Sequence, residues 1–215
     1  MINIAYSRLP DEVCSTQFQK YYAQLPGESQ EKIGRFVNRQ DKLLHLIGKL
    51  LLRDALQHFG FDKQVLHEIR YSPYLRPYIP SCNVDFNISH SGNYVLCAIG
   101  RGVRLGIDIE MIRTIDLSDF EEVMNADQWQ AISGSPDGIR TFFDYWTIKE
   151  SVIKADSRGM SIPLKDIHIV HSTAECDGNR WFLKQLDIDS NYCCCLATDQ
   201  VAAAISMEYK NYSFK

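Results

Sequence analysis

The sequence predicts an α+β fold built from two similar halves. In each half a helical region is followed by about three strands, where the apolar spacing changes from helical to alternating. A short echo supports the repeat, since residues 93–98 and 191–196 both begin with Asn-Tyr and continue with apolar residues. We therefore predict an N-terminal half of residues 1–103 and a C-terminal half of residues 104–215, with a ligand cleft between them.

The first half is expected to combine a helical region with several strands. Helices are predicted at residues 11–25 and 28–59, with a break at Pro26-Gly27, a joint near Asn38 and a stop at Gly60. Strands are predicted at residues 2–6, 66–71 and 94–99, with a short one from residue 85. Three prolines make residues 72–80 an irregular, stiff loop that presents Arg76.

The second half begins with the most regular strand pattern. After a turn at residues 100–102, alternation places Leu105, Ile107 and Ile109 on one face of a strand, and Gly106, Asp108 and Glu110 on the other. Amphipathic helical patterns follow at residues 117–132 and 139–155. Further strands are predicted at residues 167–170, 181–186, 192–197 and 202–207.

Composition narrows the class of protein. With 23 basic and 27 acidic residues the formal charge is −4, which argues against a general nucleic-acid or membrane binder. The start of the chain has no signal-peptide pattern, and no apolar run is long enough to span a bilayer. Seven cysteines without a Cys-x-x-Cys pair fit neither a disulfide framework nor a zinc site, so we expect a cytoplasmic protein.

Two stretches together predict a metal site. Trp146, Glu150 and Lys154 recur every four residues and line one stripe of a helix, with Lys149 at its edge. If this helix crosses the strand that carries Asp108 and Glu110, three carboxylates and one ammonium meet. Such an all-oxygen site suits Mg²⁺ and phosphate chemistry. The plain alternative is a surface Glu–Lys pair worth only ~0.3–0.5 kcal/mol beside an acidic strand edge.

Two other stretches suggest anion binding. The polar side of residues 28–59 has an unusual density of basic side chains: Lys32, Arg35, Arg39, Lys42, Lys49 and Arg53. Ser89, His90 and Ser91 could donate to phosphate oxygens, although a serine-rich turn and a solvated helix face explain the same residues. A Ser-His pair adjacent in sequence does not indicate an acyl-transfer triad.

Three blocks, taken together, resemble the 4'-phosphopantetheinyl transferases. They are Phe-Asn-Ile-Ser-His-Ser-Gly at residues 86–92, Gly-Ile-Asp-Ile-Glu at 106–110 and Trp-Thr-Ile-Lys-Glu-Ser-Val-Ile-Lys at 146–154. Their order and the chain length are similar to the surfactin-synthetase-activating subgroup. The resemblance implies two α+β halves related by a pseudo-twofold axis. It also implies a monomer that uses Mg²⁺ to move the phosphopantetheine arm of coenzyme A onto a serine of an apo acyl, peptidyl or aryl carrier protein, with release of 3',5'-ADP.

The resemblance also implies residue roles. Asp108, Glu110 and Glu150 are the expected metal ligands; Asp108, Glu150 and Lys154 are the expected catalytic residues. The coenzyme A contacts it implies are Lys32, Arg76, Pro77, Ser89, His90, Ser91, Asp108 and Lys154. Whether Glu150 deprotonates the carrier serine directly or through a metal-bound water stays open. Leu75 stands where the family has glycine before the basic residue, which leaves the backbone shape there undefined.

Two other functions use the same residues. A metal-dependent coenzyme A or nucleotide hydrolase would need the same acids with water as the acceptor. A non-catalytic coenzyme A or carrier-binding protein would be expected to lose an acid or the lysine. This sequence retains all four residues: Asp108, Glu110, Glu150 and Lys154. Residues 111–124 could supply apolar contacts to a carrier protein, although core filling is the simpler role for Met111 and Met124.

Overall fold

The computed structural model describes residues 1–201 and 204–215 and confirms the predicted α+β class. Its N-terminal elements are β1 Ile2–Arg8, α1 Ser15–Tyr22, α2 Gly27–Gly34, α3 Arg39–His58, the 3-10 helix η1 Lys63–Glu68, β2 Arg70–Tyr71, β3 Pro77–Tyr78, β4 Val84–Ser91 and β5 Tyr94–Arg101. The remaining elements are β6 Leu105–Met111, η2 Leu117–Phe120, α4 Ala126–Gly134, α5 Gly138–Asp156, η3 Gly159–Ser161, η4 Leu164–Asp166, β7 His168–Val170, β8 Thr173–Cys176, β9 Asn179–Gln185, β10 Tyr192–Thr198 and β11 Ile205–Tyr209.

The two large sheets share one strand arrangement. Their orders are β11-β1-β5-β4 and β6-β10-β9-β8-β7, so the antiparallel set β1-β5-β4 corresponds to β6-β10-β9. The middle strands β5 and β10 are the two segments that share the Asn-Tyr echo. Their first residues, Tyr94 and Tyr192, also touch, with ring centroids 4.9 Å apart. The repeat expected from the sequence therefore has a structural counterpart.

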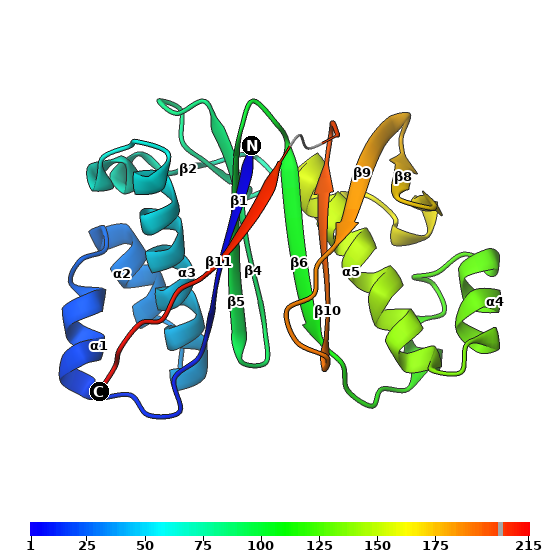
Figure 1. Ribbon diagram of the computed structural model, residues 1–215, viewed down its shortest axis with the longest axis horizontal. Helices are drawn as coiled ribbons and strands as arrows, with labels where there is room; N and C mark the ends of the chain where they lie inside the picture. Colours follow the sequence, from blue (N-terminus) through cyan, green and yellow to red (C-terminus); the bar gives the residue numbers. More distant parts are fainter. Residues whose placement is uncertain (202–203) are drawn as a thin grey trace.

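The molecule is layered, with helices outside and the two sheets inside (Figure 1). Helix α3 covers one sheet and helix α5 covers the other. The apolar faces of the sheets pack against each other through Ile2, Ile4, Leu96, Ala98, Leu105, Ile107, Ile109, Cys194 and Leu196. Burying one such branched side chain contributes roughly 1.5–3 kcal/mol. This shared core joins the halves and leaves the other face of β6 free to meet α5.

Both long helices have defined beginnings. The Asn38 side chain accepts from the Gln40 N–H at 2.8 Å and starts α3 at the joint predicted from the sequence. The Asp137 side chain accepts from the Arg140 N–H at 3.0 Å and starts α5. Helix α5 ends at Asp156, and the next residue, Ser157, has a left-handed φ of 75°. These ends place the turns carrying Glu150 and Lys154 over β6.

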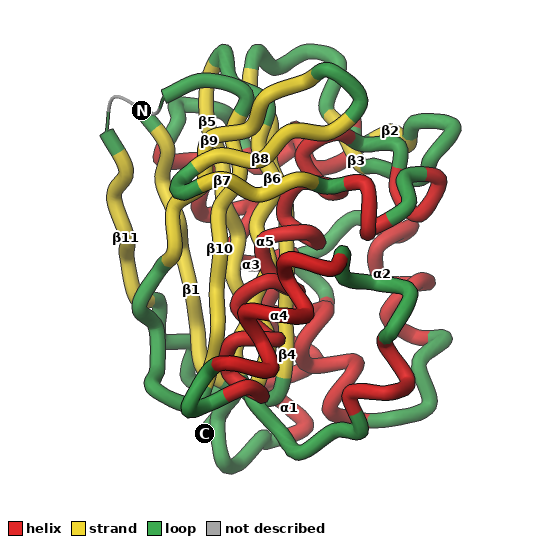
Figure 2. The backbone as a smooth tube through the Cα atoms, turned by 90° about the vertical axis from the view of Figure 1, so that its right-hand side faces the viewer, coloured by secondary structure: helices red, strands yellow, loops and turns green. Residues whose placement is uncertain are grey.

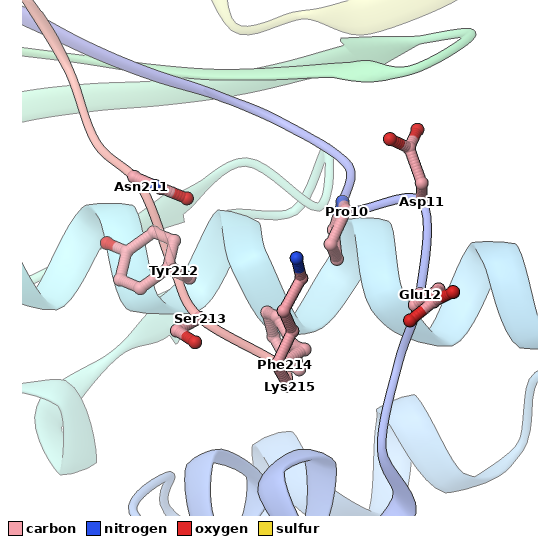
Figure 3. Close-up of a pocket in the computed structure, with 8 residues that line it drawn as sticks. All are labelled: Pro10, Asp11, Glu12, Asn211, Tyr212, Ser213, Phe214 and Lys215. Carbon is pink, nitrogen blue, oxygen red and sulfur yellow. The ribbon is translucent and has the colours of Figure 1, made fainter.

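The last strand returns to the first sheet. Strand β11 pairs in parallel with β1 at the edge of that sheet, as Figure 2 also shows. Beyond it, Tyr212 and Phe214 are buried in the core beneath α3, and the Tyr212 hydroxyl donates to Asp54 at 2.7 Å. Residues 211–215 and 10–12 line a pocket of about 490 Å³ (Figure 3). The division at residue 103 stays a prediction, and the C-terminal strand and tail lie against the first half.

Several local predictions were wrong. Residues 66–71 do not form one strand, because the Asp62 side chain caps η1 by accepting from the Gln64 N–H, and only β2 remains extended. The segment at residues 72–80 is not entirely irregular, because it contains β3, which pairs with the preceding β2 as a short hairpin. The helix predicted at residues 117–132 is divided, because the capping box of Asn125 and Gln128 starts α4 separately. No strand was predicted at the position of β8.

The predicted strand at residues 202–207 is only partly within the described structure. Residues 202–203 lie outside the described residues, and β11 begins at Ile205. In the part of the chain that the structure describes, none of the helices combines the length and apolar character needed to cross a bilayer.

Candidate active site

The site forms where α5 lies directly on β6. A Cβ atom on Gly106 would be 2.1 Å from the Ser151 carbonyl oxygen and 2.4 Å from the Ala155 nitrogen, so only glycine allows this approach. On the same face of β6 as Gly106, Asp108 and Glu110 follow at alternate positions, as predicted. The close crossing therefore brings the strand acids to the helix turn that carries Glu150 and Lys154.

Asp108 is the most buried acid of the site, with only 3% of its surface exposed. Its Oδ1 atom accepts from Lys154 Nζ at 2.6 Å and from Ser89 Oγ at 2.9 Å. Its buried Oδ2 atom finds no hydrogen-bond partner within residues 1–201 and 204–215. Burial raises the pKa of Asp108, and the charge of Lys154 opposes this shift. One buried carboxylate oxygen is thus left available to a ligand.

Glu110 and Glu150 complete the acidic group. The Ser91 hydroxyl donates to Glu110 Oε2 at 2.7 Å. Burial raises the pKa of Glu110, partly offset by the Ser91 hydrogen bond. Burial, followed by repulsion from Asp108, raises the pKa of Glu150. Three carboxylates that disfavour each other's charge would all be stabilised by one bound cation.

The acids fit a hard divalent cation but do not form a ready-made cage for one. No three His, Cys, Asp or Glu side chains among the described residues are close enough together to hold a metal ion by themselves. The chemistry of the donors is nevertheless suitable, because Mg²⁺ prefers carboxylate oxygens and keeps several of its waters. The unpartnered Asp108 Oδ2 is the observation that favours a cation here.

A pocket with several basic side chains, the cationic pocket, lies next to α3 and extends to β4, the strand beside β6. Lys32, His45, Lys49 and Tyr71 line a space of about 380 Å³. An adjoining space of about 210 Å³ is lined by His45, Lys49, Pro77 and His90, among others. Burial lowers the pKa of Lys49 and brings that of His45 to about 4. A bound anion would stabilise the positively charged form of both side chains.

The structure separates the predicted Ser89, His90 and Ser91 cluster. The two serines face the acids of β6, whereas His90 faces α3. There the ring centroids of His90 and His45 lie 5.1 Å apart. Alternation along β4 explains this division. Burial, then the nearby charge of Lys154, lowers the pKa of His90. His90 therefore belongs with the cationic pocket, and the serines belong with the acids.

Two predicted coenzyme A contacts already have partners in the protein. Arg76 Nη2 donates to both Asp85 carboxylate oxygens at 2.6 and 2.7 Å, and to the Leu105 carbonyl at 2.8 Å. Arg76 thus ties the strand β4 to the beginning of β6. Lys32 Nζ lies 3.7 Å from the centre of the Tyr71 ring and 2.8 Å from Glu28. A phosphate would have to share Lys32 with this surface pair.

Other residues of the helix stripe are structural. Lys149 is fully buried and donates to the Leu164 and Ile167 carbonyls at 2.7 and 3.4 Å, and burial lowers its pKa to about 8. Trp146 packs against Phe120 and Phe142. His45 was missed from the sequence because it sits within an apolar helix face and has no local motif.

Comparison with known proteins covers most of the chain. Residues 104–205 match the family model of the 4'-phosphopantetheinyl transferase superfamily, and residues 12–100 match that of the N-terminal part of a 4'-phosphopantetheinyl transferase. The chain is 33% identical over 172 residues to 4'-phosphopantetheinyl transferase gsp of Aneurinibacillus migulanus, covering 79% of this chain and 71% of that protein.

Two further relatives agree. Identity is 31% over 157 residues to 4'-phosphopantetheinyl transferase Sfp of Bacillus subtilis (strain 168), covering 70% of this chain and 68% of that protein. It is 28% over 207 residues to 4'-phosphopantetheinyl transferase HetI of Nostoc sp., covering 91% and 86%. The similarity therefore extends across both sheets.

Proposed function

This chain belongs to the 4'-phosphopantetheinyl transferase superfamily, and we propose that it transfers the phosphopantetheine arm of coenzyme A to a serine of an apo carrier protein, releasing 3',5'-ADP. The observation that carries this proposal is the unpartnered oxygen of buried Asp108, which belongs to an acidic group. The basic pocket connects to this group through His90, whose pKa responds to the charges of Lys154 and Asp108. Such a pair of subsites suits a ligand with several phosphates and a metal ion.

The cationic pocket is the proposed seat of the phosphate-rich end of coenzyme A. Lys32, Lys49 and His90 would donate to phosphate oxygens, and Pro77 would bound the pocket. Arg76 is 12% exposed in its ion pair, so its guanidinium would contribute mainly through its positive charge. His45 adds a ring nitrogen that becomes a donor when the phosphate favours its protonation.

The acidic group is the proposed Mg²⁺ site. Asp108, Glu110 and Glu150 would hold the ion with their carboxylate oxygens, and its waters would complete the coordination. When bound, Mg²⁺ neutralises charge on the pyrophosphate and so favours departure of the nucleotide. Support comes from burial, which raises the pKa of all three acids, since a cation relieves that cost.

The chain's own residues would then perform the proton transfers. Glu150 is a suitable base for the carrier serine, because a carboxylate with a raised pKa accepts a proton more readily than an ordinary one. Lys154, held 2.6 Å from Asp108, would donate to the oxygen of the leaving nucleotide. Ser89 lies 3.1 Å from Lys154 Nζ and would keep that ammonium in place.

The proposed setting is a reducing cytoplasm, and the proposed state is a monomer. Seven free thiols, including three adjacent ones on β10, support the first point. The second rests on the family resemblance. The proposed partners are acyl, peptidyl or aryl carrier proteins. We propose no binding to nucleic acid or to a membrane.

Intact-mass spectrometry tests the proposal. An apo carrier protein is incubated with this enzyme, coenzyme A and Mg²⁺, with a chelator as the control. The proposal predicts a mass gain of one phosphopantetheine that the chelator prevents. If coenzyme A is instead broken down without carrier modification, the enzyme is a hydrolase, and binding without any turnover would indicate a non-catalytic protein.

A further inference from the structure

Strands β4 and β6 lie side by side, although each is the edge strand of its own sheet. Polar side chains at alternate positions of β4 accept hydrogen bonds from alternate N–H groups of β6. The four pairs are Asp85 with Leu105 at 2.9 Å, Asn87 with Ile107 at 2.9 Å, Ser89 with Ile109 at 3.3 Å and Ser91 with Met111 at 3.0 Å. We call this row the seam. It satisfies edge N–H groups that would otherwise need another strand.

The identities of three seam residues, Asn87, Ser89 and Ser91, match the residue that precedes their hydrogen-bond partner on β6. Asn87 bonds to Ile107, whose preceding residue, Gly106, has no side chain. Ser89 and Ser91 bond to residues that follow an acid, and both serines also donate to that acid. The distances are 2.9 Å from Ser89 Oγ to Asp108 and 2.7 Å from Ser91 Oγ to Glu110. A hydroxyl can accept and donate at once, so serine meets both demands.

We propose that Ser91 is a positioning residue for Glu110 and does not bind coenzyme A through its hydroxyl. The Met111 N–H fixes the Ser91 oxygen, and the single hydroxyl proton is directed at Glu110 Oε2. The second carboxylate oxygen of Glu110 is thereby oriented for the cation. This replaces the role expected for Ser91 from the sequence, and it rests on the proposed function because it assumes that Glu110 holds the metal.

The proposal is specific to Ser91 rather than to the seam as a whole. Ser89 shares Asp108 with Lys154, so its removal would change two interactions. Ser91 has the simpler environment, with Glu110 as the acceptor of its proton. In addition, the Met111 N–H lies at a residue with 37% exposure, so water can replace the lost seam bond there. The Ile107 N–H, by contrast, lies in a fully buried residue, so water cannot replace its bond to Asn87.

The test measures Mn²⁺ binding by electron paramagnetic resonance at saturating coenzyme A, for wild type, Ser91→Ala, Ser91→Thr and Asn87→Ala. Removal of a group that orients a metal ligand typically weakens metal binding roughly 10- to 100-fold. We expect this loss in Ser91→Ala and recovery in Ser91→Thr, which keeps the hydroxyl. Asn87→Ala breaks a seam bond without touching an acid, so it should lower the melting temperature more and the Mn²⁺ affinity less. Because Asn87 also lines the space of about 210 Å³, its coenzyme A affinity is measured first and the coenzyme A concentration is set to saturate this variant.

Coenzyme A binding in chelator separates the possible outcomes. The proposal expects wild-type coenzyme A affinity in Ser91→Ala when no metal is present. If Ser91→Ala weakens coenzyme A binding in chelator and leaves Mn²⁺ binding unchanged, Ser91 is a substrate contact and the proposal is wrong. Equal Mn²⁺ losses in Ser91→Ala and Asn87→Ala would reduce it to a general seam effect. Absence of Mn²⁺ binding by wild type would overturn the proposed metal dependence itself.

Discussion

Helix α3 lies on β4 and β5 of the first sheet, and helix α5 lies on β6 and β10 of the second. Both helices cover the central strand of a three-strand set with the same arrangement. Their chemistry is opposite, because α3 supplies Lys49 and His45, whereas α5 supplies Glu150. Beside Glu150, α5 also brings the basic Lys154 to the acids, and Asp108 holds it in an ion pair. A repeated scaffold thus presents one cationic and one acidic subsite on either side of the β4–β6 seam.

The largest expected effect concerns the acidic half. Asp108→Asn keeps the side-chain shape but removes the charge, and we expect transfer to fall roughly 10²- to 10³-fold, as when one transition-state contact is lost. Asp108 is chosen because its Oδ2 atom has no hydrogen-bond partner among the described residues and is the oxygen proposed to bind the cation. Transfer rates at saturating coenzyme A measure the effect, and melting curves check that the variant is folded. A folded Asp108→Asn variant with near wild-type transfer would contradict the site.

The second effect compares how closely each helix approaches its sheet. Gly106→Ala places a Cβ 2.1 Å from a backbone oxygen of α5, so we expect a loss of about 1–3 kcal/mol in unfolding free energy and a displaced site. Gly48→Ala on α3 meets side-chain atoms alone, with Ile88 Cγ2 nearest at 3.1 Å and Val95 Cγ1 next at 3.5 Å. There the helix propensity of alanine offsets the contact, and the change should stay within about 1 kcal/mol. Denaturant unfolding measures both, and equal losses would contradict the comparison.

The third effect is a pH dependence that belongs to the cationic half. His45 has a pKa of about 4 in the folded protein against 6.5 when unperturbed. The unfolded chain therefore binds more protons between these values, and stability without ligand should fall as the pH drops from 6.5 towards 4. His45→Gln should flatten this slope in melting temperature. His90 shifts in the same direction, so part of the slope should persist.

Coenzyme A should reverse the effect of His45 protonation. A bound phosphate favours the charged imidazole, so affinity should rise as the pH falls through this window in wild type and rise less in His45→Gln. If the coenzyme A affinity is independent of pH in both proteins, His45 does not interact with the bound phosphate.

The smallest effect is expected at the hairpin tip of the first half. Leu75 has a left-handed φ of 63° and is 79% exposed, so glycine would relieve the strain at little packing cost. We expect Leu75→Gly to gain about 1 kcal/mol or less in unfolding free energy. The matched variant Leu75→Ala keeps a Cβ and should gain nothing. A gain in both variants would mean that the exposed side chain, rather than the backbone, is responsible.

The parts of the site predicted from sequence were those with a regular local spacing. Alternation placed Asp108 and Glu110 on one face, and four-residue spacing aligned Glu150 with Lys154. The role of Ser91 could not be predicted, because it depends on β4 lying beside β6, twenty residues later in the chain. His45 was missed because its neighbours form the apolar face of α3. Leu75 was noticed only as a departure from glycine, and its positive φ gives that departure a physical meaning.

The same limit applies to the fold. The repeat was visible because β5 and β10 share a short pattern. A helix joint was predicted near Asn38, and the structure shows that Asn38 caps α3 there. The return of β11 to β1 had no sequence signal, since a parallel pairing between the two ends of a chain leaves no local periodicity. The 3-10 helix η1 was mistaken for a strand because its apolar residues are too few to distinguish the two periods.

The most direct test of the division between the halves is calorimetric binding of coenzyme A in chelator by wild type, Lys49→Met and Glu150→Gln. Loss of one charge-assisted contact to a phosphate should weaken binding by Lys49→Met roughly 10- to 100-fold. Glu150→Gln removes a negative charge near the proposed pyrophosphate position and should bind coenzyme A as tightly as wild type or more tightly, while failing to transfer it. Weak binding by Glu150→Gln together with wild-type binding by Lys49→Met would contradict the account.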